Sequence, residues 1–374
     1  MNNKRLRILG IRGVPAAHGG FETFAEYLVL YLVQRGWDVT VYCQQDGAGT
    51  VHEDTWEGIR RVHIPVTQRG PMGTIVFDWK STLHAAKESG LLLTLGYNTA
   101  AFCALYRLKG LTNVINMDGI EWRRAKWSKP IQVWFWLNER LGCWLGNQLV
   151  ADNPGIADHL ATRVKRNKIT MIPYGAEIIG GADIALLKPL DLAPEEYALV
   201  IARPEPENSI LEIVSAFSRK RRGMKLVVLG NYEDAHLYQR EVKQAASDEV
   251  IFPGAIYDKS VVGALRFFTK LYIHGHQVGG TNPSLVEALG AGNAVLSHGN
   301  HFNRWVAGDA QAYFEDEDSC ALQLELLLHD EDRLKRMQQS SRERHHAKFT
   351  WEHILVEYEQ LLNHAVAGTV PMNE

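Results

Sequence analysis

Short apolar runs recur along the whole chain and are separated by segments long enough to form a helix. Runs of this kind are typical of strands buried on both faces of a parallel sheet, with helices in the crossovers. In the first half they cover residues 6–11, 37–43, 59–66, 91–95, 114–117, 149–152 and 169–173. In the second half they cover residues 197–202, 225–229, 250–252, 271–274 and 294–297. The pattern therefore predicts two α/β domains with parallel, Rossmann-like sheets.

Chain length supports this division, because a single hydrophobic core stops growing near about 250–300 residues and the chain has 374. Residues 175–194 are rich in glycine and proline and are predicted to be the linker. We expect an N-terminal domain over residues 1–178 and a C-terminal domain over residues 179–349. Ligands of such sheets bind beyond the carboxyl ends of the strands, so the chemistry is expected on those loops, in a cleft between the domains.

Composition excludes several classes of function. The net charge of -3 gives no general attraction to nucleic acid. The four cysteines lack metal or redox spacing and are predicted to be buried thiols. No cleavable signal segment and no apolar run of about 18 residues is visible, which predicts a cytoplasmic protein.

The first strand is followed by a loop with four glycines, an arginine and a histidine, at residues 10–20. Its backbone N–H groups and the start of the following helix suit an anion such as phosphate, although a simple tight turn would have the same composition. The candidate binding residues are Arg12, His18, Gly19 and Gly20. A dinucleotide fingerprint would need glycine where Arg12 stands, and this disfavours a dehydrogenase.

The segment from residue 274 to residue 292 gives the strongest signal. A predicted strand ends in Gly279 and Gly280, Thr281 follows, and Asn282 with Pro283 is a typical helix start. Glu287 lies about one turn into that helix. A helix start that binds phosphate, with a carboxylate one turn behind it, would hold a nucleotide's diphosphate and its ribose.

Two histidines precede these glycines. His274 and His276 alternate along the predicted strand and are expected to point to opposite faces. His276 would then face the ligand, His274 would pack, and the two could not grip one metal ion together.

The helix segment resembles the retaining glycosyltransferases of family 4, which have the GT-B fold and carry two glutamates separated by seven residues. Glu287 stands at the second position, and Gly279 stands at the first. Four motifs in order resemble the bacterial rhamnosyltransferase subgroup: RGVPAAHGGFET, NMDGIEWRRAKW, ARPEPENS and HQVGGTNPSLVEAL. The resemblance implies transfer, with retention, of a deoxysugar such as L-rhamnose from dTDP-L-rhamnose. The acceptor would be a glycan, in particular a lipid-linked oligosaccharide of surface polysaccharide synthesis.

The resemblance also assigns roles. It implies that Arg203 binds the diphosphate, with Asn208 where the family has a lysine, and that Glu287 holds the ribose. The glycine loops and Thr281 would contact the diphosphate, while Arg12 and His18 belong to the acceptor side. A surface ion pair is the alternative for Arg203. The last helix, about residues 350–366, would pack back on the N-terminal domain.

The catalytic candidates are His276, Asp118 and Glu121. An acidic side chain after the 114–117 strand would orient or deprotonate an acceptor hydroxyl, although a turn or helix cap would use the same residue. No cofactor is expected. No metal is expected either, because the acidic stretches 316–318 and 330–332 look like surface segments.

Basic residues and tryptophans gather at residues 122–145, a composition that suits a helix lying on anionic lipid. A helix packed in its own domain is the equal alternative, and the lipid-linked acceptor favours contact with the inner membrane face. The candidate membrane residues are Arg123, Arg124, Lys126, Trp127, Trp134 and Trp136.

Two other functions remain open from the sequence. A nucleotide-sugar epimerase of the same fold would need acid and base groups on both faces of the sugar and no acceptor. A scaffold without activity that binds sugar or lipid is suggested by the missing first glutamate and the missing lysine.

Overall fold

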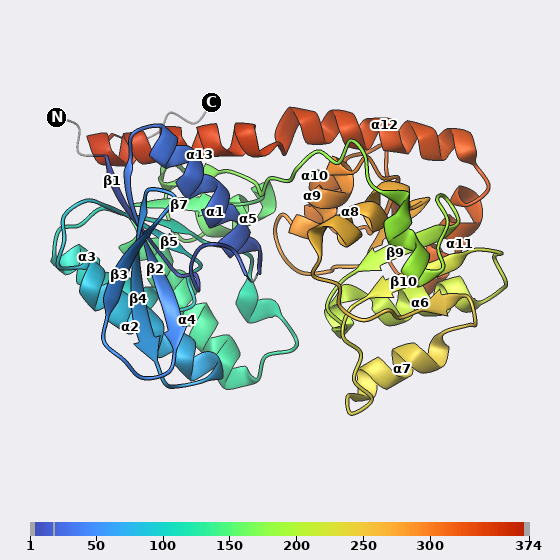
Figure 1. Cartoon of the computed structure of the whole chain (residues 1–374), viewed down its shortest axis with the longest axis horizontal. Helices are drawn as coiled ribbons and strands as arrows, with labels where there is room; N and C mark the ends of the chain where they lie inside the picture. The colour runs from blue at the N-terminus through green and yellow to red at the C-terminus, as the bar shows by residue number, and fades with distance from the viewer. Residues whose placement is uncertain (1–3, 18, 370–374) are drawn as a thin grey trace. The chain divides into compact units, whose positions relative to one another are not determined.

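The structure is a computed structural model that describes residues 4–17 and 19–369 (Figure 1). It divides into two compact units. The first unit contains the chain up to Arg123, Trp127–Pro173 and the part from Trp351 onward. The second contains Arg124–Lys126 and Tyr174–Thr350. Each unit is an α/β domain built on one sheet, as the sequence pattern predicts.

The first unit has an eight-stranded sheet in the order β3-β4-β2-β1-β5-β6-β7-β8. All neighbours are parallel except β3 and β4. The central strands are buried almost completely, which explains why they read as continuous apolar runs. The strands are β1 (Arg5–Leu9), β2 (Asp38–Asp46), β3 (His52–Trp56), β4 (Ile59–Val66), β5 (Leu91–Leu95), β6 (Asn113–Asn116), β7 (Gln148–Ala151) and β8 (Ile169–Met171).

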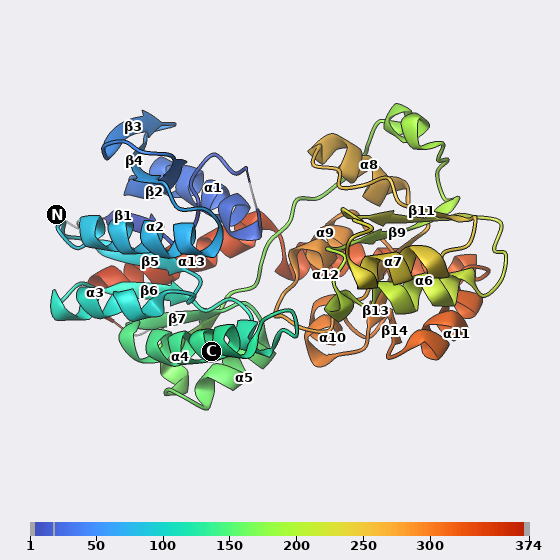
Figure 2. The same cartoon turned by 90° about the horizontal axis from the view of Figure 1, so that it is seen from below.

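Helices cover both faces of this sheet. Helices α1 (Gly19–Gln34) and α13 (Trp351–Ala367) pack on one face, and α2 (Gly70–Ala85), α3 (Ala104–Leu108) and α4 (Lys129–Leu145) lie on the other (Figures 1 and 2). Helix α5 (Pro154–Ala161) connects β7 to β8.

Helix α13 comes from the end of the chain but is part of the first unit. Its apolar stripe is buried: Tyr358 packs on Phe24 with ring centroids 4.5 Å apart, and Trp351 stacks on Tyr27 at 4.5 Å. Asn116, the last residue of β6, donates a hydrogen bond to Tyr358 Oη at 2.7 Å. The last helix therefore supports the strand end that precedes Asp118.

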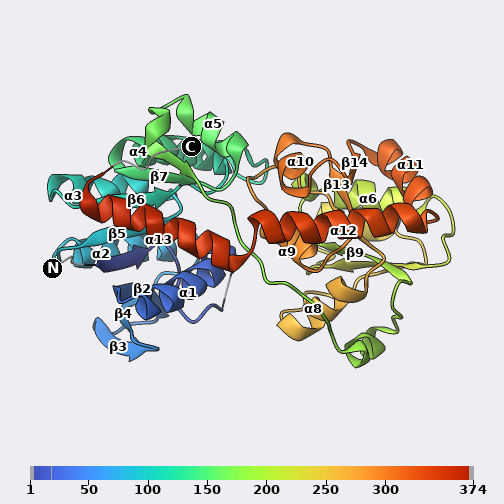
Figure 3. The same ribbon diagram turned by 90° about the horizontal axis from the view of Figure 1, so that it is seen from above.

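The second unit has a six-stranded, fully parallel sheet in the order β11-β10-β9-β12-β13-β14. Its strands are β9 (Tyr197–Ile201), β10 (Lys225–Leu229), β11 (Val250–Ile251), β12 (Leu271–His274), β13 (Val295–His298) and β14 (Ala312–Phe314). Its helices are α6 (Ile210–Ser218), α7 (Leu237–Ala245), α8 (Lys259–Phe268), α9 (Pro283–Gly290), α10 (His301–Ala307), α11 (Glu317–Leu327) and α12 (Glu331–Lys348), and α12 runs along the unit as the long red helix of Figure 3.

Some elements were not predicted. Strand β3 is almost entirely exposed, so it has no apolar pattern, and the cross-strand ion pair between Asp54 and Arg61 helps to hold it on the edge. Strand β14 is only three residues long. The predicted linker contains a 3₁₀ helix, Ile184–Leu190, because Leu187 is fully buried against the second unit.

The four cysteines are buried and free, which confirms the prediction of core thiols. In the part of the chain that the structure describes, no helix is both long and apolar enough to cross a bilayer.

Candidate active site

The strand order of the second unit reverses between β9 and β12, because the chain moves outward from β9 to β10 and β11 and then returns to β12 on the other side. Ligands of open parallel sheets bind beyond the carboxyl ends of the strands at such a point. Arg203 follows β9, and the glycine loop at 275–280 follows β12. The topology therefore brings two sequence-predicted segments to one place.

The two loops are bound to each other directly. Gln277 N–H donates to the Glu207 carbonyl at 2.9 Å, and Ser209 Oγ donates to the Gly275 carbonyl at 2.9 Å. Glycine is required at position 275, because a Cβ there would lie 2.1 Å from the Asn208 carbonyl oxygen.

Arg203 is exposed at the end of β9, and no carboxylate of the described residues lies within 4.0 Å of its guanidinium. Arg203 therefore forms no surface ion pair with the described residues. Asn208, which stands where the family has a lysine, is 5% exposed and donates Nδ2 to the Arg203 carbonyl at 2.8 Å. Asn208 thus fixes the loop that carries Arg203 and supplies no charge.

Helix α9 begins as its sequence predicts. Asn282 is the N-cap, its Oδ1 accepts from Ser284 N–H at 3.0 Å, and Pro283 occupies the first turn. Gly279, with φ of +137°, adopts a backbone conformation that disfavours side chains, and it leads into Gly280 and Thr281, which are buried. The positive end of the helix dipole and its first N–H groups therefore lie beside Gly280 and Thr281, where they favour an anion.

Glu287 lies one turn into α9, and its side chain is 36% exposed. It forms an ion pair with Arg266 of α8, whose side chain is 9% exposed and also donates to Ser284 Oγ at 3.4 Å. Ser284 Oγ in turn bonds Tyr272 Oη. A guanidinium at this depth needs an acidic partner, since an unpaired buried charge is strongly unfavourable.

Arg266 was missed by sequence reasoning. It sits in the apolar run VVGALRFF, and a lone arginine inside such a helix is the only signal that could have marked it. Its contacts make it the residue that fixes the Glu287 carboxylate.

The prediction that His274 and His276 point to opposite faces is wrong. Strand β12 ends at His274, so the alternation of a strand does not extend to His276, and the two rings stack with centroids 4.3 Å apart. His274 is buried in the stack and neither of its ring nitrogens has a partner among the described residues.

His276 is held as a neutral imidazole. Burial, and then the charges of Arg124 and Arg203, lower its pKa to about 3. Its carbonyl accepts from Asn300 and Asn303 at 2.9 and 2.8 Å. At neutral pH its ring can donate one hydrogen bond and accept another, but it carries no charge.

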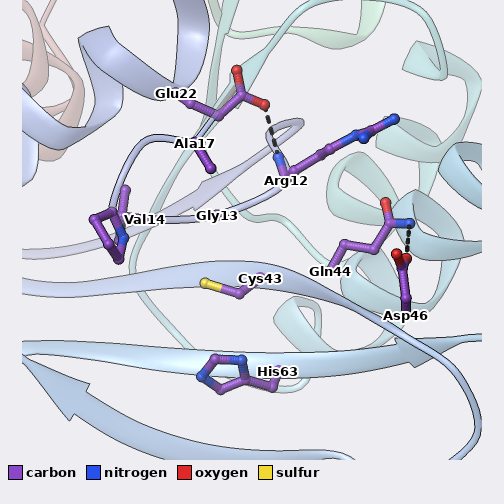
Figure 4. Close-up of a pocket in the computed structure, with 10 residues that line it drawn as sticks. Arg12, Gly13, Val14, Ala17, Glu22, Cys43, Gln44, Asp46 and His63 are labelled. Carbon is purple, nitrogen blue, oxygen red and sulfur yellow. Dashed lines mark hydrogen bonds between the residues drawn. The ribbon is translucent and has the colours of Figure 1, made fainter. Parts of the chain in front are cut away.

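In the first unit, the loop between β1 and α1 lines a cavity of about 290 Å³ (Figure 4). Arg12 N–H donates to Glu22 Oε1 at 3.1 Å, and the Arg12 side chain is exposed. Strands β2 and β4 contribute Gln44, Asp46 and His63 to the same cavity. Gly19, with φ of +67°, is the first residue of α1 and Gly20 follows. His18 lies outside the described residues.

Asp118 follows β6 with a φ of +51°, a left-handed conformation that costs about 1 kcal/mol for a residue other than glycine. Its N–H donates to Asn116 Oδ1 at 3.0 Å, so Asn116 makes the turn. Glu121 N–H donates to Tyr97 Oη at 2.8 Å, and Glu121 Oε2 accepts from Trp127 Nε1 at 3.3 Å.

Trp122 anchors this loop through the buried carboxylate of Glu139, which accepts its Nε1–H at 2.7 Å. The same carboxylate accepts from His159 at 3.0 Å and from Arg163 at 2.6 Å. Burial raises the pKa of Glu139, but His159, Trp122 and Arg163 outweigh it and lower the pKa. The loop that carries Asp118 and Glu121 is therefore attached to helix α4 through Trp122.

The candidate membrane residues fall into different environments. Arg124 pairs with Glu207 at 3.0 Å, and both side chains are largely buried. Trp127 packs on Phe135, and Trp134 donates Nε1 to the Asn98 carbonyl at 2.8 Å. Arg123 is exposed, Lys126 is half-buried, and Trp136 is 38% exposed.

The acidic stretches serve as helix caps. Asp316 caps α11 through a capping box with Ser319, and Asp330 caps α12 by accepting from Arg333 N–H at 2.9 Å. Within residues 4–17 and 19–369 no group of three or more His, Cys, Asp or Glu side chains could hold a metal ion.

The chain has two α/β units, each built on a sheet whose strands are parallel except for β3, and comparison with solved structures shows that this is the GT-B fold. Sucrose-phosphate synthase from Thermosynechococcus elongatus superposes with a TM-score of 0.79 at 17% identity, over 98% of this chain and 100% of that one. The UDP-forming α,α-trehalose-phosphate synthase from Burkholderia vietnamiensis gives 0.76 at 11% identity, over 99% and 100%. HepE from Anabaena, in complex with UDP, gives 0.74 at 13%, over 96% and 99%.

Residues 188–344 match the family Glycosyl transferases group 1, and residues 3–177 match a family described as Domain of unknown function (DUF1972). The residues that match the glycosyltransferase group 1 model lie within the unit that carries Arg203 and Glu287. A search of curated proteins returned no matching sequence.

Proposed function

We propose that the protein is a glycosyltransferase that takes its sugar from a nucleotide-diphosphate donor bound by the second unit. The observation that carries this proposal is the arrangement at the β9 and β12 ends. Arg203 is exposed, pairs with no carboxylate of the described residues and follows β9, whose last residue Ile201 accepts from Ser284 Oγ in the first turn of α9 at 3.4 Å. Glu287 stands one turn further along α9. The separation of a cationic group from a carboxylate suits a diphosphate followed by ribose hydroxyls. HepE, which shares the fold, was solved with UDP and with UDP-glucose.

Each residue has a role in this proposal. Arg203, Gly280, Thr281 and the α9 N–H groups bind the diphosphate. One oxygen of Glu287 is held by Arg266, and the other accepts from the ribose. Asn282 and Gly279 shape the loop, and neutral His276 donates a hydrogen bond to the sugar or to the departing phosphate.

The reaction proceeds with retention at the anomeric carbon. The bond between that carbon and the β-phosphate oxygen breaks, and the acceptor hydroxyl oxygen bonds to the same face. The departing phosphate takes the hydroxyl proton, so no protein nucleophile is needed. Asp118 orients the acceptor hydroxyl, Glu121 holds the same loop through Trp127, and Arg12 and His18 belong to the acceptor side.

The donor sugar is proposed to be L-rhamnose from dTDP-L-rhamnose. The four sequence motifs support this assignment, and so does Gly279 at the position where the wider family carries a sugar-binding glutamate. The acceptor is proposed to be a lipid-linked oligosaccharide, which would bring the protein to the inner face of the cell membrane.

A product analysis tests the proposal. The protein is incubated with dTDP-L-rhamnose, UDP-glucose or GDP-mannose, with and without a lipid-linked acceptor extract, and the sugar and nucleotide products are separated. Nucleoside diphosphate release that depends on the acceptor, with the sugar recovered on the lipid fraction, is expected for one donor. Conversion of the donor sugar without acceptor would identify an epimerase, and no turnover of any pair would identify a scaffold.

A further inference from the structure

The helical face of the first unit formed by α2, α3 and α4 is unusually apolar at its surface. Ten of the seventeen large apolar side chains that are exposed among the described residues belong to these three helices. The three helices lie side by side on one face of the sheet (Figure 2). Exposed apolar side chains gathered on one face of a protein often mark an interaction site.

Helix α4 supplies most of this surface. Asn138, Glu139, Gly142 and Cys143 form its buried stripe against the domain. The outward positions 133, 136, 137, 140 and 144 follow helical spacing, and Trp144 is 59% exposed. The apolar side chains that α4 exposes are Ile131, Val133, Trp134, Trp136, Leu137 and Trp144.

The neighbouring helices extend the surface. Leu108, at the end of α3, is 85% exposed, and Met72 of α2 is 58% exposed. Trp79 of α2 is also exposed, and its ring packs in a tilted arrangement against Phe102 of the 3₁₀ turn that precedes α3, with centroids 5.1 Å apart. That turn contacts α4 as well, so the three helices present one layer.

The charges of this layer are one-sided. The only acidic residues on α2, α3 and α4 are Asp78 and Glu139, and both are buried. The exposed charges are basic, on Lys80, Arg107 and Lys129. The guanidinium of Arg140 lies 3.4 Å from the centre of the Trp136 ring. A chain with a net charge of -3 therefore presents a face without exposed acid on these helices.

We infer that the α2, α3 and α4 face is a lipid-contact surface that seats the first unit on an anionic bilayer. Tryptophan rings beside basic side chains suit the boundary between headgroups and acyl chains, because the rings are amphipathic and the cations attract anionic lipid. A second copy of the chain is the less favourable occupant, since a two-fold contact would place basic groups of both copies against each other. This lipid-contact surface is inferred from the exposed residues of α2, α3 and α4 alone. If the proposed function is right, the surface would bring the enzyme to its lipid-linked acceptor.

The surface differs from the segment that the sequence indicates. Arg124 and Trp127 are engaged inside the protein. Trp144 lies in the predicted segment 122–145 but is not one of its six candidate residues, and Leu108 and the α2 residues had no lipid signal in the sequence. Of the six candidate membrane residues named from the sequence, only Trp134 and Trp136 belong to the α2, α3 and α4 face.

Vesicle sedimentation tests the inference with the full chain. Wild type is compared with Trp136→Ser combined with Trp144→Ser, and with Arg107→Glu combined with Lys129→Glu. The controls are Leu237→Ser with Leu322→Ser, and Lys335→Glu with Arg336→Glu, which change exposed residues of the second unit. Vesicles are phosphatidylcholine with or without phosphatidylglycerol.

Wild type and both controls should pellet with the anionic vesicles, and each first-unit variant should bind at least about tenfold more weakly. Salt should weaken wild-type binding without removing it. Equal binding by all variants, or no binding by wild type at low salt, would overturn the inference. Wild type that self-associates without lipid, when the Trp136→Ser, Trp144→Ser variant does not, would overturn the inference. That result would assign the face to contact with a second copy of the chain. Thermal stabilisation by dTDP or UDP, measured on the same samples, reports separately on the donor site.

Discussion

At the scale of single residues, the candidate donor site depends on how Arg266 presents Glu287. Replacing Arg266 by Gln removes the ion pair and leaves the Glu287 carboxylate without its fixed partner. We expect a loss of about 1–3 kcal/mol of stability, and in addition a rise in the donor KM or nucleotide Kd of at least about tenfold. Lysine at this position should restore part of the affinity, because it keeps the charge but not the planar fork.

Arg222 provides the matched control for this prediction. Its side chain is 3% exposed and pairs with Glu325 at 2.9 Å in the same unit, away from the site residues. Arg222→Gln should lower the stability comparably and leave nucleotide affinity unchanged. If both variants lose only stability, Arg266 is a structural residue and does not position Glu287.

His276 gives a prediction about pH. Its pKa is lowered to about 3 in the folded protein, below the ordinary value of 6.5. The unfolded chain therefore binds more protons between these two values, so the contribution of His276 to stability is present above about pH 6.5 and is lost as the pH falls. Replacing His276 by Asn should make the melting temperature less sensitive to pH between about 7 and 4. If the melting temperature of the His276→Asn variant varies with pH as that of wild type does, His276 takes up protons equally in the folded and unfolded states.

At the scale of elements, the start of α9 contributes both to stability and to nucleotide binding. Substituting its N-cap Asn282, and comparing the result with another helix cap, distinguishes these two effects. Asn282→Ala removes the N-cap and should cost about 1 kcal/mol. It should also weaken nucleotide binding several-fold, because the first N–H groups of α9 lose their fixed direction. Asp258→Ala, which removes the side-chain cap of α8, should cost about as much stability without affecting binding. Equal binding by both variants would remove α9 from the donor site.

The sequence predicts the central elements well because they carry strong local signals. Strands β4, β5, β10 and β12 have the predicted boundaries, and Asn282 with Pro283 marks α9. Strand β3 is held by ion pairs at an exposed edge, and no local pattern shows this. The stacking of His274 and His276 depends on where β12 ends, and the pairing of Arg266 with Glu287 joins two helices, so neither could be derived from the sequence.

At the scale of the whole molecule, the account requires that charge neutralisation of the donor comes from Arg203 and helix N–H groups. The acidic stretches 316–318 and 330–332 supply the N-caps of α11 and α12. EDTA should therefore leave most of the transfer activity intact, as measured by product formation before and after chelation. Activity that EDTA abolishes and magnesium or manganese restores would contradict this prediction.

The central claim is that the second unit binds a nucleotide diphosphate through Arg203 and Glu287. Titration calorimetry with dTDP and UDP measures this directly for wild type, Arg203→Ala and Glu287→Ala, with folding checked by thermal melting. We expect wild type to bind one nucleotide saturably. Each folded variant should bind it about tenfold more weakly or worse, because a charge-assisted hydrogen bond is lost. Binding of equal strength by wild type and both variants would place the nucleotide elsewhere and contradict the account.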